Sequence, residues 1–535
     1  MAWNKGVGDT VTNVLRQAAA TSPDAIFLDF QGEMHSYGDV ARQSFRLAHG
    51  LIALGVKPGD TVVSVLDNNI DAVVAWFGIN LAGAISVPVN TAYKGEFLRH
   101  QIADAGAAIV IAESDYAERI LAVADGLPQM TTLLHRGAAP AARPGLAMLP
   151  LADSLRDGDD SALPVARPGD LAMLIYTSGT TGPSKGCMIS HGYACNIARQ
   201  SIRSTVRTPD DIYWTALPLF HFNATATGVL ATAMLGARCV VYPRFSLSGF
   251  WPDILRSGAT VASLLGSMHP LIAEAPDTEA SLACFGQLRS VGAAPFPKDL
   301  QDKWRRRFGA QIMGAAGYGL TEAAMVVTGP LTERLDPNSS GPRTLEFEVV
   351  IVDDDENPVP DGTPGEVLIR PNQPFVMFEG YWNRPAETLK VMRNQWFHSG
   401  DIGKFGTNGE FYFLDRKKDY LRRRGENISS FEMEATFQNH PDIVDVAVHA
   451  VLSDIGEDDV KVTCVLQPES TLTEHALCTW ALDHVPYFAV PRYIEFRSDL
   501  PRNPMGKILK FQLRDEGCTP ATWDREKADF KMAKR

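Results

Sequence analysis

Strand-like and helix-like apolar patterns alternate through the first 135 residues of the chain. Residues 60–66 form a mostly apolar run that is typical of a buried strand, whereas residues 70–82 carry apolar side chains at helical spacing. Alternation of this kind predicts parallel sheets covered by helices. The expected helices are residues 10–20, 36–54, 70–82 and 96–105, and the expected strands are residues 25–30, 60–66, 84–88 and 108–112.

The same alternation continues beyond a connection rich in Ala, Pro, Arg and Asp, which we expect at the surface over residues 136–169. Short strands and turns then indicate a small antiparallel β subdomain at about residues 341–414. A basic segment follows, and helices and strands resume. We therefore expect a large domain of residues 1–414 and a small α+β domain of residues 415–535. The further expected strands are 171–175, 211–217, 237–242, 261–265, 288–291, 310–313, 346–352, 365–370, 396–397, 410–413, 445–451 and 461–466, and the further helices are 225–235, 299–308, 430–440 and 474–484.

Composition and charge exclude several classes of protein. The chain has 535 residues, of which 45% are hydrophobic and 21% charged, as in globular proteins. A net charge of −13 argues against nonspecific nucleic-acid binding, because that binding depends on Lys and Arg. The seven cysteines form no CxxC pair, so neither a zinc site nor a disulfide framework is indicated. We expect a cytoplasmic protein, with no integral membrane association and a homodimer as a weak expectation.

The most distinctive stretch is residues 176–186, between two apolar segments. It combines glycines, which let several N–H groups face one point, with hydroxyl donors and one lysine. Such a set suits a polyanion such as a nucleotide triphosphate. The spacing is not that of a P-loop, and an exposed hairpin turn is the alternative. The expected phosphate-binding residues are Thr177, Ser178, Gly179, Thr180, Thr181, Gly182 and Lys185.

The order of this stretch resembles the phosphate-binding loop of the adenylate-forming superfamily of acyl-CoA synthetases, luciferases and adenylation domains. Further motifs match in family order over about residues 10–515. Residues 318–322 resemble the motif in which Tyr318 stacks on adenine, Thr321 touches the α-phosphate and Glu322 holds Mg²⁺. Asp401 resembles the aspartate that accepts the ribose hydroxyls, and Arg416 the arginine that also contacts ribose.

The resemblance implies further nucleotide contacts in glycine-containing loops at the carboxyl ends of strands, where open α/β sheets bind ligands. They are Gly292, Ala293, Ala294, Ala316, Gly317, Gly319 and Phe413. It also implies a loop over residues 501–507 that delivers Lys507 to the active site. The implied catalytic residues are Lys507, Thr181, Glu322 and His221.

The resemblance implies a mobile C-terminal domain. A large domain of two parallel α/β sheet subdomains plus a β subdomain would bind the nucleotide, and the small domain would rotate about Lys418 between two half-reactions. Arg424, Gly425 and Glu426 would then line the coenzyme A site. The implied reaction forms an acyl-adenylate and pyrophosphate from a carboxylic acid and MgATP, and coenzyme A then releases AMP and acyl-CoA.

Among family members, bacterial medium-chain acyl-CoA and crotonobetaine/carnitine-CoA ligases are especially similar. The implied acyl pocket contains mainly small or apolar residues, and no obvious arginine awaits a second carboxylate. An apolar or weakly polar acid, with room for a branched or cyclic one, is therefore expected. An adenylation enzyme that loads a carrier protein and a non-catalytic nucleotide-binding protein are the alternatives. The expected pocket residues are His221, which would act as a gate, Phe222, Asn223, Thr227, Met268, Val291, Ala315, Ala323 and Met325.

Overall fold

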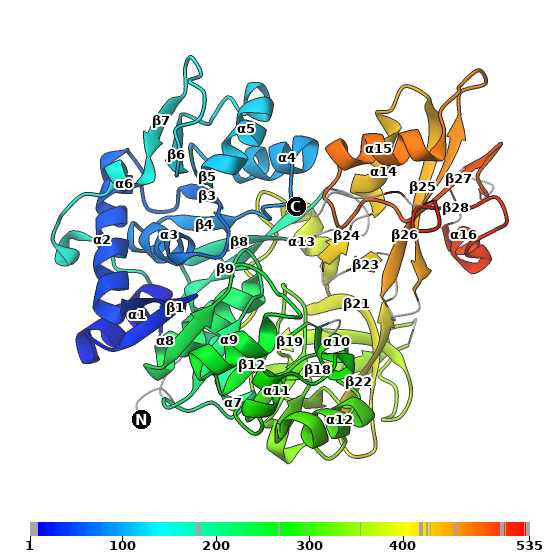
Figure 1. Ribbon diagram of the computed structural model, residues 1–535. Coiled ribbons are helices and arrows are strands. Elements are labelled where there is room, and N and C mark those ends of the chain that lie inside the picture. Colours follow the sequence, from blue (N-terminus) through cyan, green and yellow to red (C-terminus); the bar gives the residue numbers. More distant parts are fainter. Residues whose placement is uncertain are drawn as a thin grey trace.

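The computed structural model has two large sheets, one smaller sheet and a separate C-terminal unit (Figure 1). It describes residues 9–177, 183–265, 268–294, 296–353, 355–416, 421–423, 426–428, 430–453, 457–502, 508, 510–528 and 530.

The first large sheet is parallel except at one edge, where β8 and β9 form an antiparallel pair. The two strands are thus joined by the glycine- and hydroxyl-rich stretch. Along β3, Val62 and Val63 face different apolar clusters, so the sheet is buried on both faces. In sheet order the strands are β7 (Ala147–Pro150), β6 (Thr132–Arg136), β5 (Ile109–Glu113), β3 (Thr61–Val65), β4 (Ile85–Pro88), β8 (Leu171–Thr177) and β9 (Lys185–Ser190).

The second large sheet is parallel except for β2 at its edge. Its alternating side chains also divide between two clusters: Tyr213 belongs to the cluster shared with the first sheet, and Trp214 to a cluster on the opposite face. In sheet order the strands are β14 (Ile312–Gly314), β13 (Ser290–Gly292), β12 (Val261–Ser263), β10 (Ile212–Thr215), β11 (Arg238–Val241), β1 (Ile26–Phe30) and β2 (Glu33–Ser36).

One layer of helices contributes to the cluster that the two sheets share, and other helices cover the outer faces. The shared layer is α1 (Val11–Thr21), α2 (Tyr37–Ala53), α3 (Ile70–Leu81), α7 (His191–Ser204), the π-helical segment Asn223–Leu230 and α8 (Ala231–Leu235). The outer helices are α4 (Gly95–Ala105) and α5 (Ser114–Val123) on the first sheet, and α9 (Phe250–Ser257), α10 (Met268–Glu274), α11 (Glu279–Ala283) and α12 (Lys298–Phe308) on the second.

A smaller antiparallel sheet packs on the same shared cluster through Phe347, Phe397 and Phe411. Its strands are β17 (Gly341–Pro342), β22 (Glu410–Arg416), β21 (Trp396–Phe405), β19 (Gly365–Pro371) and β18 (Phe347–Val352), with β20 (Met392–Arg393) beside β21 and α13 (Pro385–Val391) before it. A short pair, β15 (Gly317–Tyr318) and β16 (Val327–Thr328), connects the second large sheet to it.

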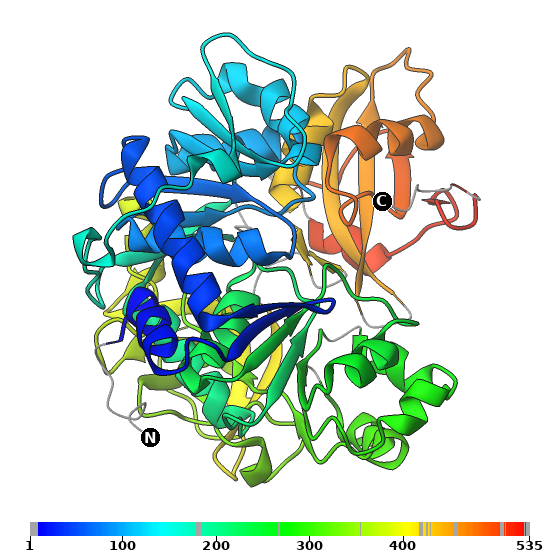
Figure 2. The same cartoon turned by 60° about the vertical axis from the view of Figure 1, so that its left-hand side comes forward.

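The C-terminal unit has its own apolar core. Tyr93 and Phe97, which lie near and in α4 of the large domain, also pack against this core. Figures 1 and 2 show it in orange and red beside the blue and green sheets. It contains the hairpin β23 (Leu421–Arg423) and β24 (Glu426–Ile428), the sheet β25 (Ile443–Leu452), β26 (Asp458–Leu466), β27 (Tyr493–Arg497) and β28 (Trp523–Asp524), and the helices α14 (Ser430–Gln438), α15 (Glu474–His484) and α16 (Lys510–Glu516).

This architecture confirms the expected α/β fold class, and three local expectations are corrected. Residues 136–169, expected as a connection, contain β7 and α6 (Leu151–Ser154). The strand expected at 396–397 extends through Phe405 and includes Asp401. The helix expected at 225–235 begins as the π-helical segment. Among the described residues, no helix is long and apolar enough to span a membrane.

Candidate active site

The glycine- and hydroxyl-rich stretch joins two strands whose ends are paired in register. Thr177, the last residue of β8, lies opposite Lys185, the first of β9. The backbone therefore makes a hairpin, the shape that both interpretations of this stretch require. Ser178, Gly179, Thr180, Thr181 and Gly182 lie outside the described residues, so their role stays a prediction.

Lys185 belongs to a chain of polar contacts that ends at Glu322. Its Nζ pairs with a Glu387 carboxylate oxygen and lies 5.0 Å from the centre of the Tyr381 ring. The Tyr381 hydroxyl donates a 2.8 Å hydrogen bond to Glu322 Oε1. Burial, followed by the Glu322 charge, raises the pKa of Tyr381, so its hydroxyl remains a donor at neutral pH. The fold thus brings the expected phosphate lysine and the expected metal carboxylate to opposite sides of one tyrosine.

The loop that carries Thr321 and Glu322 is held in place by Tyr193 of α7. The Tyr193 hydroxyl donates to Thr321 O at 2.9 Å and accepts from Ala324 N at 2.6 Å. Gly319 lets this loop close tightly, because a Cβ there would lie 2.5 Å from Met325 N and 2.6 Å from Ala323 O. Backbone placement therefore determines where the Glu322 carboxylate points.

Tyr318 and Asp401, far apart in sequence, are in contact. The Tyr318 hydroxyl donates a 2.7 Å hydrogen bond to Asp401 Oδ2, and its ring lies at 4.7 Å from Phe411 and nearly parallel to Phe413 at 5.9 Å. Asp401 of β21 is paired with Arg416 of β22 in register. The side chain of Arg416 is outside the described part of the chain. A flat aromatic surface beside a buried carboxylate suits a base and its ribose.

The two remaining nucleotide loops lie at the ends of neighbouring parallel strands. Gly292 ends β13 beside Gly314 of β14, and Ala293 N donates to Gly314 O at 3.2 Å. Ala316 lies between β14 and β15, Gly317 is the first residue of β15, and Ala294 is exposed. The carboxyl edge of the second sheet thus brings these residues close to Tyr318.

Glu322 is, among the described residues, the buried carboxylate that we expected to hold a metal ion. Among the described residues no three His, Cys, Asp or Glu side chains gather as a metal cluster. Mg²⁺ in nucleotide sites is commonly held by one or two carboxylates together with substrate phosphates and water. Glu322, with one oxygen already held by Tyr381, fits that requirement.

The turn after β10 meets the C-terminal unit at His221. His221 Nε2 lies 3.1 Å from Glu426 Oε2, and Asn90 Nδ2 donates to the same oxygen at 3.3 Å. The β23–β24 hairpin is therefore docked on the large sheets. Lys418, Arg424, Gly425 and Lys507 lie outside the described residues, and their expected roles stay predictions.

Of the residues expected to form the acyl pocket, Phe222, Ala323 and Met325 belong to the apolar cluster that includes α7 and the π-helical segment. Val291 belongs to the cluster on the opposite face of the second sheet, so the structure does not bring it to the same side as the others. Phe222 packs on Tyr193 at 5.4 Å, and Thr227 Oγ1 donates to Asn223 O at 2.7 Å. Val291 and Ala323 are fully buried, Ala315 and Met325 nearly so, and Met268 is half-buried beside Leu265. Sequence reasoning missed four residues that contact these elements, Tyr193, Gln200, Arg207 and Tyr213. It also missed Tyr381, which contacts Lys185 and Glu322.

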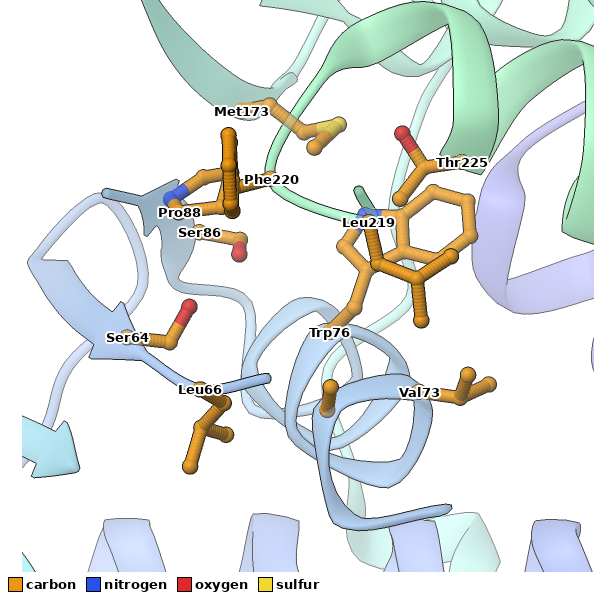
Figure 3. A pocket seen from close by; sticks show the side chains of 11 residues that line it. Ser64, Leu66, Val73, Trp76, Ser86, Pro88, Met173, Leu219, Phe220 and Thr225 are labelled. Carbon is orange, nitrogen blue, oxygen red and sulfur yellow. The ribbon is translucent and has the colours of Figure 1, made fainter. Parts of the chain in front are cut away.

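A separate cavity lies beside Leu219 and Phe220, in the turn that precedes His221 (Figure 3). It is lined by Trp76 of α3, Ser86 of β4, Leu219, Phe220 and Thr225, among others, and by none of the expected acyl-pocket residues. Its volume of about 20 Å³ is room for roughly one water molecule. This cavity is too small for an acyl group in the conformation described.

Comparison with known proteins decides what kind of site this is. The AMP-binding enzyme family matches residues 15–382, and the AMP-binding enzyme C-terminal domain matches residues 432–507. The chain belongs to the AMP-binding enzyme family. This places it in the adenylate-forming superfamily, in agreement with the order of its motifs.

Relatives of this AMP-binding enzyme are acid–CoA ligases. A crotonobetaine/carnitine–CoA ligase from Salmonella arizonae is 29% identical, with 91% of this chain and 95% of the relative covered. A feruloyl-CoA synthase from Amycolatopsis is 31% identical, with 96% and 99% covered. In structure, an o-succinylbenzoate CoA synthetase from Bacillus subtilis shares the fold with a TM-score of 0.80 at 23% identity, over 95% of this chain and 99% of the other.

These matches confirm three expectations from sequence. The AMP-binding enzyme is an AMP-forming acid–CoA ligase, its fold is that of the superfamily, and ATP, Mg²⁺ and coenzyme A are its cofactors and cosubstrates.

Proposed function

We propose that the enzyme activates a monocarboxylic acid with an apolar body and transfers it to coenzyme A. The contact chain from Lys185 through Tyr381 to Glu322 carries this proposal. The first half-reaction brings a carboxylate to a triphosphate, and positive charge must be concentrated where the two anions meet. Lys185 and the Thr177–Gly182 donors would supply it on one side of Tyr381. Glu322 would hold Mg²⁺, which neutralises phosphate charge when bound.

In the first half-reaction, Tyr318 and Asp401 would orient the adenosine, and the acid would attack the α-phosphorus. We assign Thr321 to the α-phosphate and Lys507 to the gap between the substrate carboxylate and that phosphate. Removing one preorganised donor of this kind typically costs about 10²–10³ in rate.

In the second half-reaction, the coenzyme A thiol would attack the acyl carbon after pyrophosphate has left. We propose that residues 415–535 form the small domain that rotates about Lys418 between the two steps. The docking of Glu426 on His221 supports this role for the β23–β24 hairpin. Arg424, Gly425 and Glu426 would then line the coenzyme site, with His221 at the boundary of the acyl pocket.

The chemical class of the acid substrate is the more specific part of the proposal. The relatives are named for crotonobetaine or carnitine, for long-chain fatty acids and for ferulate, so the family scaffold accepts very different acyl groups. Small side chains at Ala315, Ala316 and Ala323 favour a branched or cyclic acyl group here. A homodimer and a cytoplasmic location stay predictions.

Pyrophosphate release over a panel of carboxylic acids tests the function, with free coenzyme A and a phosphopantetheinyl carrier protein compared as acceptors. We expect ATP- and acid-dependent pyrophosphate release, followed by thioester formation on free coenzyme A. Acyl transfer to the carrier protein alone would contradict coenzyme A as the acceptor. The absence of pyrophosphate release with every acid would contradict the proposed function.

Lys507→Ala tests the assignment of the two half-reactions. We expect acyl-adenylate formation to fall by at least about 10², because the substrate carboxylate loses its positive partner. Thioester formation from supplied acyl-adenylate should survive. An equal loss of both half-reactions in a folded variant would show that Lys507 has a different role.

A further inference from the structure

An arginine that the proposed mechanism does not use contacts the loop before Tyr318. Arg334 Nη2 lies within hydrogen-bond distance of three backbone carbonyl oxygens, at 3.1 Å from Ala315 O, 3.4 Å from Ala316 O and 3.4 Å from Gly329 O. Ala315 and Ala316 lead into β15, which carries Tyr318, and Gly329 follows β16 directly. One guanidinium group therefore contacts the chain on both sides of the β15–β16 pair.

This guanidinium is buried, and no carboxylate of the described residues is bonded to it. Its Nε and Nη1 atoms have no hydrogen-bond partner in the same part of the chain. Burial lowers the pKa of Arg334 to about 10, and the charge of Glu410 offsets this effect only in part. A cation in such a place costs stability, and an apolar side chain of similar length would avoid that cost. Packing alone therefore does not explain the arginine.

The backbone around Arg334 leaves room for the guanidinium and fixes its base. Gly341 of β17 has a φ of +107°, and a Cβ at this position would overlap Arg334 Nη1. The next two residues, Leu335 and Asp336, each donate a 2.9 Å backbone hydrogen bond to the Glu410 carboxylate of β22. Arg334 thus extends from a segment attached to β22 towards the loop before β15.

The strand β22 also carries the aromatic side chains that face Tyr318. The rings of Phe411 and Phe413 lie 4.7 Å and 5.9 Å from the Tyr318 ring. Gly341 is paired with Phe411 in register. Arg334 therefore connects the two parts of the proposed base site, which are the loop that leads to Tyr318 and the strand opposite it.

Two further elements hold the same loop. Ala316 O accepts 2.6 Å hydrogen bonds from Ser204 Oγ of α7 and from Thr328 Oγ1 of β16. These two bonds use both lone pairs of that oxygen. The shortest contact of Arg334 is with Ala315 O instead, so the arginine fixes the adjoining peptide group.

We propose that Arg334 is a positioning residue that sets the preference of the enzyme for ATP over GTP. Stacking on Tyr318 accepts any base, because every base has a π face. Adenine and guanine differ at their edges, where adenine has an amino group and guanine a carbonyl oxygen. The backbone of residues 315–317 borders Tyr318 and can distinguish these edges only if it is held in place. The inference rests on the proposed nucleotide site.

The ratio of kcat/KM for ATP to kcat/KM for GTP tests it, measured by pyrophosphate release with a saturating acid. We expect the unmodified enzyme to prefer ATP. Arg334→Met should lower the ratio at least about fivefold, because small displacements of groups that contact a substrate are costly. The ratio does not respond to a uniform loss of folded enzyme.

Gly341→Ala keeps the arginine but displaces its guanidinium, so its ratio should fall in the same direction. If Arg334→Met gives no folded protein, the ratio of Gly341→Ala decides. Arg238→Met is the matched control. Arg238 of β11 also donates to a backbone carbonyl, Ser257 O at 2.6 Å, and its Nε is also buried without a hydrogen bond to the described residues. We expect an unchanged ratio in this control.

The proposal is overturned if the unmodified enzyme shows no preference for ATP, if Arg334→Met keeps the ratio, or if Arg238→Met lowers it equally. Each of these outcomes leaves the ligase function standing. An unchanged KM for ATP in Tyr318→Ala would remove the nucleotide site on which the inference rests. The absence of pyrophosphate release with ATP and every acid would remove the proposed function as well.

Discussion

Tyr381 is the residue that connects the two charged groups of the proposed phosphate site, Lys185 and Glu322. Its ring contacts Lys185 and its hydroxyl bonds to Glu322. Because burial raises the pKa of this phenol, the hydroxyl stays protonated and donates a hydrogen bond throughout the neutral pH range. It does not become a phenolate that could itself bind Mg²⁺. One Glu322 oxygen is thereby oriented by Tyr381.

Tyr381→Phe keeps the ring over Lys185 and removes the donor to Glu322. A hydrogen bond to a charged group contributes about 1.5–3 kcal/mol, so we expect the Mg²⁺ concentration for half-maximal pyrophosphate release to rise at least several-fold. Titrating Mg²⁺ at saturating ATP measures this. Tyr116→Phe, which loses a bond to Asp67 on the surface, is the matched control. An unchanged Mg²⁺ dependence would mean that Tyr381 does not position Glu322.

The loop between β15 and β16 shows how an element places a functional group through its backbone. Tyr193 bonds to the loop at Thr321 and Ala324, and Gly319 allows the two sides of the loop to approach each other. Close approach, rather than a left-handed backbone, is what requires glycine at this position.

Gly319→Ala should therefore open this loop. A Cβ at 2.5 Å from Met325 N cannot be accommodated without moving backbone, so we expect kcat/KM for ATP to fall by at least about tenfold, since small misplacements of catalytic groups are costly. Gly249→Ala is the control, because the nearest atoms to its new Cβ are side-chain atoms of Ser246 and Asp253, none closer than 3.2 Å, and not backbone. Equal kinetics in the two variants would contradict the argument.

The C-terminal segment is attached to β26 and β27 by a buried ion pair. Lys461 Nζ bonds to Glu495 Oε2 at 2.6 Å and to Gly517 O at 2.7 Å, and Thr519 donates to Glu495 at 2.9 Å. Burial alone would raise the pKa of Glu495, but hydrogen bonds from Lys461, Thr522 and Arg497 outweigh it and lower the pKa to about 2.

Acid should weaken this attachment. Since the folded pKa lies below the value of about 4.3 in unfolded chains, the stabilisation is complete above roughly pH 5 and is lost as the pH falls towards 2.

Glu495→Gln should destabilise the C-terminal unit by about 3–5 kcal/mol at pH 7, because Lys461 loses its buried partner. Hydrogen exchange of β26 and β27 measures this, and the difference from the unmodified protein should shrink near pH 3. In Glu495→Met with Lys461→Met, where no charge is left unpaired, part of the loss should be recovered. A difference that is independent of pH would contradict the assignment.

At the scale of the whole molecule, the C-terminal unit docks on the large sheets through polar contacts and through Tyr93 and Phe97, which pack on its apolar core. Glu426 contacts both His221 and Asn90, and Glu432 accepts from Ser184 N at the end of the phosphate hairpin. These polar contacts join side chains and backbone atoms outside the apolar cores, which suits the rotation that we propose between the half-reactions.

Glu426→Ala should disfavour the docked arrangement. We expect thioester formation from supplied acyl-adenylate to slow by about tenfold, which corresponds to the loss of about 1.4 kcal/mol of stabilisation of the docked arrangement. Adenylation should slow less. Single-turnover assays of the two half-reactions measure the ratio. Asp483→Ala on the exposed face of α15 is the control. Equal slowing of both steps would show that this contact does not select between arrangements.

The sequence by itself determined the fold class and the order of the site motifs. Periodicity identifies strands and helices such as residues 60–66 and 70–82, because burial of one or both faces dictates which positions are apolar. The glycine- and hydroxyl-rich stretch and the family motifs gave Tyr318, Glu322 and Asp401, because their chemistry depends on residue type and local spacing.

Only the tertiary structure decided which side chains meet. Tyr381 and Tyr193 look like ordinary aromatic residues in sequence, and Arg334 looks like a surface arginine. Their roles follow from contacts with Glu322, Ala324 and Ala315, which come from other elements. Local patterns cannot report such contacts, because partners distant along the chain are brought together by the packing of sheets and helices rather than by sequence spacing.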